Sequence, residues 1–559
     1  MIAMHVLSAV EMQACDRAAT ERFGIPSLDL MRAASSAVAA FARRQFPHAN
    51  RVTVLCGTGN NGGDGMMAAW LLAEAGLDVT TILLGAPDKL RGDAAVAWRE
   101  LTSPVRGSIH VATAAGDLEK HDDALAADLI VDAVLGTGFK PPMKGMALAA
   151  LAWLRKSAAP ILAIDLPSGW PADETAATAS GAVFPADAVV TFTAPKPAHV
   201  FGALTRRWDQ PVVVAPIGSP DAAVVSSLGI DWAGSSLALV QAPRAAAANK
   251  GSFGHVLVVG GSFGWVGGKA GAPAMAALAA LRAGAGLVTA AVPAPALPVV
   301  ASFAPELMTW PLAATDAGQI AARNLNAAEI SALTAGKTVL AIGPGMGQSA
   351  ETAKFTAGLL AATKMPAVID ADALNILAAK PVLLAKLAKG RTLVLTPHPG
   401  EMARLASSSI AEVQANRLQA ARTFAQRLGV TLVLKGARTL IAHPDGRVAV
   451  NTSGNPGMAK GGSGDVLTGL IAALLAQYPE DVARAVEAAV YLHGLAADIA
   501  VRQADEHTVL ATDALACLAP AFGSRRHRIA GDGRSGYVWL QGIACSGLRA
   551  NAADLRRIL

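Results

Sequence analysis

The sequence predicts an α/β protein built from two successive domains, each with a mainly parallel β-sheet. Its 559 residues exceed what one core absorbs, at about 150 residues per domain. Short apolar runs alternate with alanine-rich helical stretches along most of the chain, which is typical of strands covered by helices on both faces. Hydrophobic residues make up 53% and charged residues 16%, so intrinsic disorder of the bulk of the chain is excluded.

Charge and hydropathy argue against nucleic-acid and membrane partners. Lysine plus arginine number 47 against 42 acidic residues, and no long basic block is present. The longest uncharged stretch, 283–305, contains Gly284, Gly286 and three prolines, which favours a buried strand and a loop over a bilayer span. Glu11 and Asp16 interrupt any N-terminal export signal, and the four cysteines form no C-x-x-C pair. We therefore predict a cytoplasmic protein with reduced thiols.

Two series of predicted strands divide the chain. Residues 217–250 break the alternating pattern with scattered glycine, serine and proline, and we interpret them as the junction. We place the domains at 1–225 and 226–523 and expect an irregular tail at 524–559, for which the sequence indicates no function. A fragment that begins near Ser235 is expected to fold alone, because each half is large enough for its own core. The first series lies at 52–57, 78–85, 129–136, 160–167 and 187–196, and the second contains HVLVVGGS, GLVTAAV, TVLAIGPG, PAVIDADAL, TLVLTPHPG and VTLVLKG.

A glycine-rich loop, GTGNNGGDG, follows the first predicted strand and opens a helix. Gly57, Gly59 and Gly62 match the G-x-G-x-x-G fingerprint of dinucleotide-binding folds, so a Rossmann-like domain is expected. Asp64 would lie at the start of the helix, where a carboxylate repels phosphate but attracts a cation. The next strand ends without the acidic residue that binds a ribose, which disfavours an ordinary dehydrogenase.

Polar side chains follow other strands of the first half as well. Asp132 is in VDAVLGTGFKPP, and Asp165 and Ser168 are in IDLPSGW. Loops after parallel strands meet at one edge of a sheet, where Asn61, Asp132 and Ser168 offer oxygen ligands to a hard cation. Taken singly, each of these residues is more commonly a helix cap or an Asx turn. Their joint placement at three strand ends favours a cation site, and a single carboxylate suits a large monovalent ion better than magnesium.

GNNGGDG, VDAVLGTG and AIDLPSG, preceded by EMQACDRAATERFGIPSLDLMRAAS, resemble the family of NAD(P)H-hydrate epimerases over roughly residues 7–219. The resemblance implies a Rossmann-like domain that binds NADHX or NADPHX, the hydrated nicotinamide cofactors, and K⁺ held by Asn61, Asp132 and Ser168. It also implies a catalytic role for Asp165, which we expect to handle a proton or to aid loss and return of hydroxide at C6. The residues implied to contact the hydrate are Asn60, Asn61, Gly62, Gly63, Asp64, Gly136, Thr137, Gly138, Phe139, Lys140, Pro141, Pro142 and Asp165.

The most informative segment of the second half is NTSGNPGMAKGGSGDVLTGLIAALLA, which starts at Asn451. GGSGD leads into an apolar helix, so the backbone N–H groups of Gly462, Ser463 and Gly464 form a site for phosphate. Asp465 then stands where a base is needed beside a transferring phosphoryl group. A plain helix cap is the alternative for Asp465. The glycine density disfavours it, because each misplaced glycine costs about 0.5–1 kcal/mol.

Four other loops of the second half agree with a nucleotide site. KGART at 435–439 offers a cation, a glycine backbone and a hydroxyl, and GPGMG at 343–347 allows a ligand close to the backbone. TPHPGE places His398 after a predicted strand. His398 and Glu401 could bind a metal together, but Glu401 is more simply interpreted as an acidic residue in the first turn of a helix. DADAL at 370–374 adds two acids that act through magnesium or cap a helix.

These motifs together resemble the ADP- or ATP-dependent NAD(P)H-hydrate dehydratases, a ribokinase-like family, over roughly residues 237–519. The resemblance implies a ribokinase-like α/β domain that uses ADP or ATP with Mg²⁺ and acts as a lyase. Asp465 would deprotonate the C6 hydroxyl, and phosphate rather than hydroxide would leave. The implied contacts with the hydrate are Ala272, Gly345, Gly347, His398 and Asp465, and those with the nucleotide are Lys435, Gly436, Ala437, Arg438, Thr439 and Gly464.

The sequence thus predicts a bifunctional enzyme of nicotinamide cofactor repair, with the epimerase first and the dehydratase second. Its expected partners are NADHX or NADPHX and an adenine nucleotide, in a homo-oligomer without nucleic acid or membrane. The alternative is a ribokinase-like small-molecule kinase fused to a nucleotide-sensing Rossmann-like module. Arg32 and Ser35 keep that alternative open for the first domain, because the epimerase family usually has glutamate and glycine at these positions.

Overall fold

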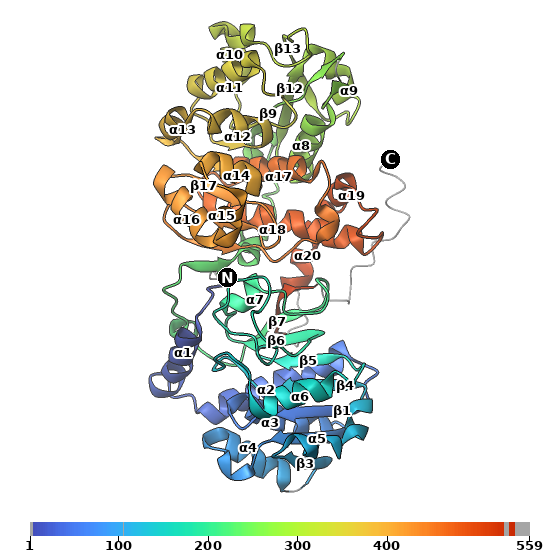
Figure 1. Ribbon diagram of the computed structural model, residues 1–559. Coiled ribbons are helices and arrows are strands. Elements are labelled where there is room, and N and C mark those ends of the chain that lie inside the picture. Colours follow the sequence, from blue (N-terminus) through green and yellow to red (C-terminus); the bar gives the residue numbers. More distant parts are fainter. Residues whose placement is uncertain (1–3, 104, 266, 530–535, 543–559) are drawn as a thin grey trace. The chain divides into compact units, whose positions relative to one another are not determined.

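The computed structural model describes residues 4–103, 105–265, 267–529 and 536–542, which divide into two compact units (Figure 1). The first unit contains residues 4–229 together with 536–542, and the second contains residues 230–529. Cys545 and most of the predicted tail lie outside the described residues. Within the described ranges, no helix is both long and apolar enough to cross a membrane.

The first unit has an eight-stranded sheet in the order β20-β7-β6-β5-β4-β1-β2-β3. All neighbours are parallel except β20, which is antiparallel to β7. From β1 the chain builds outward through β2 and β3 and then returns to the other side of β1 with β4, which is the doubly wound order of a Rossmann-like domain. The strands are β1 (Arg51–Cys56), β2 (Asp78–Leu84), β3 (Ser108–Ala112), β4 (Leu129–Ala133), β5 (Ile161–Ile164), β6 (Ala188–Phe192), β7 (Val212–Ala215) and β20 (Val538–Gln541).

Successive residues of a strand point to opposite sides of the sheet. Because the strands are apolar at successive positions, both faces of this sheet are apolar, and helices cover both of them. Phe41 and Leu72, from α2 and α3, belong to one apolar cluster together with Val54 of β1. Leu151 of α6 belongs to a second cluster together with Leu55, the next residue of β1. The helices are α1 (Ala9–Glu21), α2 (Ser27–Gln45), α3 (Asn60–Glu74), α4 (Gly92–Thr102), α5 (Ala115–Glu119), α6 (Gly145–Leu154) and α7 (Pro197–Phe201).

The second unit has a ten-stranded sheet in the order β13-β12-β9-β14-β15-β16-β17-β18-β19-β8. Only β18 runs antiparallel to its neighbours. The strands are β8 (Ile230–Trp232), β9 (His255–Val259), β12 (Leu287–Pro293), β13 (Met308–Leu312), β14 (Val339–Ile342), β15 (Ala367–Ile369), β16 (Leu393–Leu395), β17 (Thr431–Leu434), β18 (Leu440–Ala442) and β19 (Val448–Val450), and β10 (Phe263–Gly264) pairs with β11 (Gly267–Gly268) in a separate hairpin.

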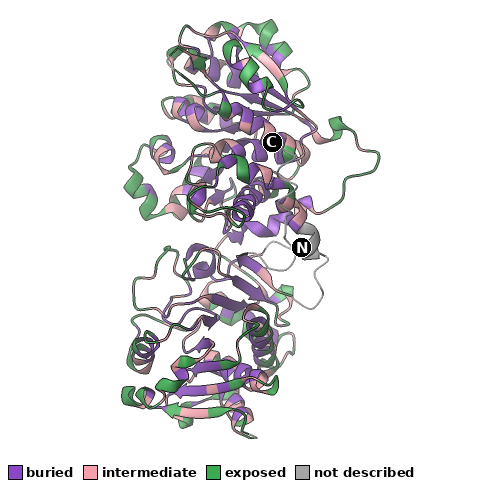
Figure 2. Cartoon of the chain, turned by 90° about the vertical axis from the view of Figure 1, so that its right-hand side faces the viewer, coloured by how far each residue is buried: buried purple, intermediate pink, exposed green. Residues whose placement is uncertain are grey.

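The helix α17 (Ser463–Gln477) is central to the second unit. It packs against α8 and α18 and also contacts β9, β14 and β15, so most of its side chains are buried. Figure 2 shows the buried residues of the chain in purple. The other helices are α8 (Gly271–Arg282), α9 (Leu297–Ala301), α10 (Ala327–Thr334), α11 (Ala350–Ala362), α12 (Ala371–Ala378), α13 (Pro381–Ala388), α14 (Pro399–Ala406), α15 (Ile410–Ala415), α16 (Arg417–Leu428), α18 (Val482–Val501), α19 (Ala511–Ala516) and α20 (Leu518–Ile529).

The predicted fold class of two α/β parts with parallel sheets is confirmed, and every predicted strand is present. Two segments differ from the expectation. The junction at 217–250 contains β8, which is an edge strand of the second sheet. The tail expected to be irregular from 524 continues α20 to Ile529 and contributes β20 to the first sheet. Both strands are short, and their partners are far away in sequence, so local periodicity did not reveal them.

Two candidate active sites

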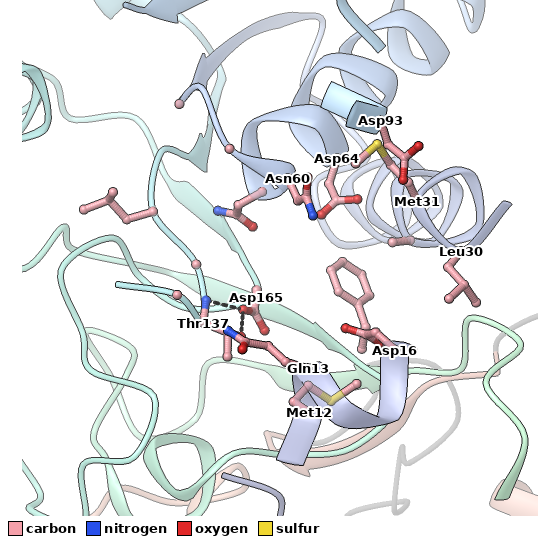
Figure 3. Close-up of a pocket in the computed structure, with 18 of the residues that line it drawn as sticks. Met12, Gln13, Asp16, Leu30, Met31, Asn60, Asp64, Asp93, Thr137 and Asp165 are labelled. Carbon is pink, nitrogen blue, oxygen red and sulfur yellow. Dashed lines mark hydrogen bonds between the residues drawn. The ribbon is translucent and has the colours of Figure 1, made fainter. Parts of the chain in front are cut away.

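A cavity of about 850 Å³ opens in the first unit where the strand order reverses. β1 and β4 are neighbours, but the chain leaves them toward opposite edges of the sheet, and ligands of such folds bind at this point. The loops after β1 and β4 form one side of the cavity, while α1 and α2 contribute side chains to another (Figure 3). Five acidic residues line it, namely Asp16, Glu21, Asp64, Asp93 and Asp165, and Figure 3 labels the four aspartates.

Asp165 is held in an uncommon backbone conformation with its carboxylate fully engaged. Its φ of 66° lies in the left-handed region, which costs a non-glycine residue about 1–3 kcal/mol and is found mainly at functional sites. Oδ1 accepts hydrogen bonds from Lys196 Nζ at 2.8 Å and from Thr191 Oγ1 at 2.9 Å. Oδ2 accepts from the backbone N and the hydroxyl of Thr137. Burial alone would raise the pKa of Asp165, but the charge of Lys196 and these donors hold it well below its usual range.

Lys196 and His199 complete this arrangement, and the sequence motifs did not reveal either residue. Lys196 is buried beside Asp165. His199 Nδ1 accepts a hydrogen bond from the backbone N of Lys196, and Nε2 donates to the carbonyl oxygen of Asp165 at 2.7 Å. Burial and the charge of Lys196 lower the pKa of His199 to about 4, so the ring is neutral. Lys196 ends a predicted strand, but no local pattern marked it as functional.

The surroundings of Asp64 shift its pKa in the direction opposite to that of Asp165. Asp64 is the fifth residue of α3, beyond the first turn, so it does not lie at the helix start as the sequence predicted, and the helix begins after Gly59 without a side-chain cap. Burial, followed by the charges of Asp165, Asp16 and Asp93, raises the pKa of Asp64 well above its ordinary value. Its carboxyl group has no hydrogen-bond donor among the described residues. The cavity therefore contains two carboxyl groups whose surroundings favour opposite protonation states.

Asp132 and Ser168 lie close together, at the ends of β4 and β5. The Ser168 hydroxyl donates to Asp132 Oδ1 at 2.6 Å, and the Ser168 backbone N donates to Oδ2 at 2.8 Å. Burial raises the pKa of Asp132 to about 6. Asn61 is packed against Gly136, and its amide nitrogen is buried without a hydrogen-bond partner in the described part of the chain. Because the amide oxygen and nitrogen are interchangeable by rotation, Asn61 can present its oxygen to a cation instead.

The cavity brings together part of the set implied for the hydrate. Gly62 and Gly63 are buried within α3, behind the lining residues. Arg32, whose presence put the epimerase in question, does not line the cavity but pairs with Glu100 of α4 at 2.7 Å. The implied residues that line the cavity are Asn60, Asn61, Asp64, Gly136, Thr137, Gly138, Phe139 and Asp165, whereas Gly62, Gly63, Lys140, Pro141, Pro142, Asp132 and Ser168 do not.

In the second unit, Asp465 lies in the first turn of α17. The helix begins after Gly462, whose φ is 99°, and no side chain caps its N-terminus. Asp465 is therefore not the helix cap, and the backbone N–H groups of the first turn are available to an anion. Burial, then the charge of Asp370, raises the pKa of Asp465 to about 7, although Lys435 and Lys269 act in the opposite direction. This value suits a general base near neutral pH.

Asp370 holds Lys435 at this site. Asp370 Oδ1 accepts hydrogen bonds from Lys435 Nζ at 2.9 Å and from Thr396 at 2.7 Å, and Oδ2 accepts from Thr468 of α17 at 2.9 Å. The backbone of Gly464 passes so near that a Cβ there would lie 3.5 Å from Lys435 Nζ. The lysine charge is thus fixed beside the start of α17, where a phosphate would bind.

His398 and Glu401 cap α14 rather than forming a metal pair. Glu401 Oε2 accepts from the backbone N of His398 at 2.9 Å, while His398 Nδ1 accepts from the backbone N of Gly400 at 3.0 Å. Burial, then the charge of Lys435, lowers the pKa of His398. The His398 side chain remains half exposed, and its Nε2 lies 3.4 Å from Glu401 Oε1. Among the described residues, no group of three or more His, Cys, Asp or Glu side chains could hold a metal.

The loop after β14 lies against the start of α8. Gly345, with a φ of 62°, comes so close that a Cβ there would meet Ala272 at 3.1 Å. The backbone N of Gly347 donates to Asp372 at 2.9 Å. Lys269 lies 4.0 Å from the same carboxylate, so Ala272, Gly345 and Gly347 do gather at one place.

The loop at 435–439 is organised by arginines. Arg417 donates to the carbonyl oxygens of Ala437 and Lys435, at 2.6 and 3.3 Å. Arg438, whose φ is 54°, donates to Thr452 at 3.2 Å, and burial lowers the pKa of Arg438 to about 10. The Thr439 hydroxyl donates to Gly436 O at 2.9 Å. The loop therefore offers a nucleotide mainly its backbone and Lys435.

The fold and these sites define a two-domain α/β enzyme with one candidate ligand site in each domain. The family model described as NAD(P)H-hydrate dehydratase matches residues 256–520, and the model described as YjeF-related protein N-terminus matches residues 27–198. The chain belongs to the family of bifunctional NAD(P)H-hydrate repair enzymes. The resemblance stated from the sequence motifs is thereby confirmed.

Three relatives illustrate the extent of the similarity. The bifunctional NAD(P)H-hydrate repair enzyme of Moorella thermoacetica is 41% identical over 526 residues, which is 92% of this chain and 95% of the relative. The enzyme of the same name from Escherichia coli is 36% identical over 90% of this chain and 91% of its own length. The crystal structure of an ADP/ATP-dependent NAD(P)H-hydrate dehydratase from Bacillus subtilis, co-crystallized with ATP/Mg²⁺, is 31% identical, has a TM-score of 0.43, and covers 52% of this chain and 97% of its own.

Proposed function

We propose that this chain repairs hydrated nicotinamide cofactors in two steps. The first unit interconverts the R and S forms of NADHX or NADPHX at C6, and the second dehydrates the S form to NADH or NADPH at the expense of ADP or ATP. Membership of a family whose relatives carry both matched domains supports the pairing. For the first unit, the observation that carries the proposal is that Asp64 and Asp165 line one cavity, in surroundings that raise the pKa of Asp64 and lower the pKa of Asp165.

Epimerisation requires loss of the C6 hydroxyl and its return to the opposite face. Asp64, when protonated, can deliver a proton so that the hydroxyl leaves as water, and the ring becomes cationic. The ionised Asp165, fixed by Lys196 and Thr137, stabilises this cation without changing its own protonation. A water then adds to the opposite face and passes its proton to another carboxylate on the cavity, such as the exposed Asp16.

Potassium is proposed to bind through Asn61, Asp132 and Ser168. Asp132 is a buried carboxylate without a cationic partner among the groups that shift its pKa, and the buried amide nitrogen of Asn61 has no hydrogen-bond partner among the described residues. A monovalent cation beside them would balance the charge of Asp132 and, once the Asn61 amide is rotated, would be bound by the amide oxygen. It would order the loops after β1 and β4 that face the hydrate. The cation acts by fixing these loops, so its binding is measurable as a rise in Tm as well as through activity.

In the second unit, Asp465 is proposed to remove the proton of the C6 hydroxyl. The resulting oxygen attacks the terminal phosphorus of ADP or ATP, and the bond from that phosphorus to the bridging oxygen breaks, so that AMP or ADP leaves. The N-terminus of α17 and Lys435 stabilise the charge that develops. Phosphate then leaves C6 and a proton leaves the neighbouring ring carbon, which restores the dihydronicotinamide double bond. Ala272, Gly345, Gly347 and His398 would surround the hydrate.

The nucleotide would rest on the backbone of residues 436–439 and Gly464, with Lys435 at its phosphates. Mg²⁺ fits as a companion of those phosphates, because it keeps most of its waters and needs only one or two carboxylates. It would neutralise phosphate charge. Asp370, which contacts Lys435, and Asp372, which lies 4.0 Å from Lys269, are the carboxylates of this site that would accept hydrogen bonds from its waters.

Incubation of the protein with mixed NADHX epimers, with and without ADP or ATP, tests the proposal. We expect the absorbance of reduced nicotinamide to return only when nucleotide is present, and we expect both epimers to be consumed. Consumption of one epimer only would refute the epimerase. Accumulation of a phosphorylated product without reduced nicotinamide would favour the small-molecule kinase. A homo-oligomer stays a prediction, which sedimentation can check.

A further inference from the structure

The strand β20, which follows the second unit in the sequence, completes the sheet of the first unit. β20 pairs antiparallel with β7, with Val538 opposite Val214 and Trp539 opposite Val213. All four residues of β7 are buried, so without β20 the unpaired edge of an apolar strand would be left open. Trp539 belongs to the main apolar cluster of the first unit and is only 9% exposed. The first unit therefore depends on residues that lie more than 300 positions after its other strands.

Residues of the same segment, Tyr537 and Trp539, also pack against the middle of α2. The Tyr537 hydroxyl donates to the carbonyl oxygen of Ala37 at 2.6 Å. The Tyr537 ring meets the ring of Phe41 edge-on with 5.4 Å between centroids, and the Trp539 ring lies 6.1 Å from the same ring. Phe41 is 1% exposed. One buried aromatic residue of α2 is thus enclosed by two aromatic residues of the returning segment, and aromatic pairs of this kind add stability beyond their buried area.

α2 is also a wall of the candidate epimerase cavity. Leu30, Met31 and Ala34 line the cavity, and Ala37 follows less than one turn after Ala34. A helix transmits a displacement along its length as a rigid body, because each turn is hydrogen-bonded to the next. A shift at Ala37 and Phe41 would therefore move the apolar side chains that face the hydrate.

A second connection runs through β7. Gly536 lies against Pro216, so that a Cβ there would be 3.3 Å from its ring. The next residue, Ile217, lines the cavity. At the other end of the strand, Gln541 Nε2 donates to Thr205 Oγ1 at 2.8 Å and to Gln210 O at 3.0 Å. The packing of Gly536 at one end of β7 and the hydrogen bonds of Gln541 at the other hold the segment against this strand.

We infer that residues 536–542 are a positioning segment for the epimerase site. They touch neither the cavity nor its carboxyl groups; they hold α2 and Ile217, which form part of its apolar wall. The reacting groups, Asp64 and Asp165, lie on other elements. Loss of the segment is therefore expected to weaken binding of the hydrate more than it slows the chemical step. This inference rests on the proposed epimerase function for its kinetic readout.

The effects of losing the segment on KM and on kcat of epimerisation show whether the segment positions the cavity wall or only stabilises the unit. If the segment only kept the unit folded, its loss would reduce the amount of active enzyme, and apparent kcat would fall with KM unchanged. If the segment positions the wall, KM rises while kcat stays nearly constant. A displacement of about 1 Å far from the chemistry can cost up to about 10²-fold, so a rise in KM of about fivefold or more is expected for the stronger variants.

The test uses point variants of the full chain and two truncations. Tyr537→Phe removes only the hydroxyl bound to Ala37, and Tyr478→Phe, at a half-buried tyrosine of the second unit, is its matched control. Trp539→Ala removes the ring beside Phe41, and Trp539→Phe should restore most of the KM. A chain that stops after Ile529 lacks the segment, whereas one that stops after Gly542 keeps it.

We expect a higher KM for the hydrate in Tyr537→Phe, Trp539→Ala and the shorter truncation, with dehydratase rates equal to wild type. An unchanged KM in all three would overturn the inference, and so would an equal loss of both activities. Hydrogen exchange provides a test without catalysis: α2 and β7 should exchange faster in the shorter truncation than in the longer one. If the wild-type protein does not epimerise the hydrate, the proposed function fails. The hydrogen-exchange rates of the two truncations would then still show whether the segment holds α2.

Discussion

Lys196 Nζ lies 2.8 Å from Asp165 Oδ1, and both side chains are buried in the wall of the first unit's cavity. Because Thr137 and Thr191 occupy the other acceptor positions, Asp165 is kept ionised and poorly basic. The pair therefore provides a fixed negative charge for a cationic intermediate, and the transfer of protons falls to Asp64 and Asp16.

Lys196→Met is expected to abolish most epimerase activity. It leaves Asp165 buried without its cation, which costs about 3–5 kcal/mol for a buried pair, or it drives the carboxyl group to take up a proton. Either result removes the fixed negative charge, and we expect kcat to fall about 10²-fold or more. Initial rates of epimerisation and thermal unfolding are measured together. Lys156→Met, at an exposed lysine paired with Asp122, is the control and should change neither quantity much. Wild-type kcat in folded Lys196→Met would refute the role of the pair.

The dehydratase should require ionised Asp465. Its pKa is raised to about 7, and a general base works only when deprotonated, so activity is low below this pKa and levels off above it. We expect kcat/KM to increase about tenfold between about pH 6 and pH 8. Asp465→Asn should reduce turnover about 10²–10⁴-fold. The increase in kcat/KM with pH should disappear in this variant, while nucleotide binding should remain. Asp445→Asn, at an exposed turn of the same unit, is the matched control. A variant with wild-type turnover would exclude Asp465 as the base.

Removal of potassium should impair only the first reaction. With potassium, the Tm of the first unit and the epimerase rate should exceed their values in sodium or in a bulky organic cation, because the ion binds only the folded site. Asp132→Ala should abolish these differences, while Asp123→Ala, at an exposed residue of the same unit, should preserve them. Dehydration rates serve as the internal control. Equal Tm and rates in all three cations would argue against any functional potassium site.

The sequence allowed prediction of the features that are encoded locally. The central strands are uninterrupted apolar runs, and the glycine motifs after β1 and before α17 require a particular backbone, so both were recognised from short windows. Lys196 was not recognised, because its partner Asp165 is 31 residues away and no motif joins them. Nor did the sequence reveal that four hydrogen bonds would make Asp165 a poor base, since the donors come from two segments, at Thr137 and at 191–196, that are both distant from Asp165 in sequence.

β8 was missed for a related reason, and it changes the expected limits of an independent second domain. A fragment that begins near Ser235 would lack β8 (Ile230–Trp232), which pairs with β19. Trp232 is 3% exposed, its Nε1 donates to Thr452 Oγ1 at 2.8 Å, and its ring packs edge-on against Tyr491. Removing a buried tryptophan costs about 3–5 kcal/mol, a large share of the stability of a typical domain.

We therefore expect residues 229–529 to fold and to dehydrate the S epimer at the rate of the full chain. The fragment from Ser235 should unfold at a clearly lower temperature. Trp232→Ala within the longer fragment should reproduce most of that loss, because it removes the packing but keeps the strand, whereas Trp232→Phe should lose less. Thermal unfolding followed by circular dichroism, with dehydratase rates measured on the same samples, checks these expectations. Equal Tm values for the two fragments would mean that β8 contributes nothing to the second domain, and an inactive 229–529 fragment would mean that this domain depends on the first.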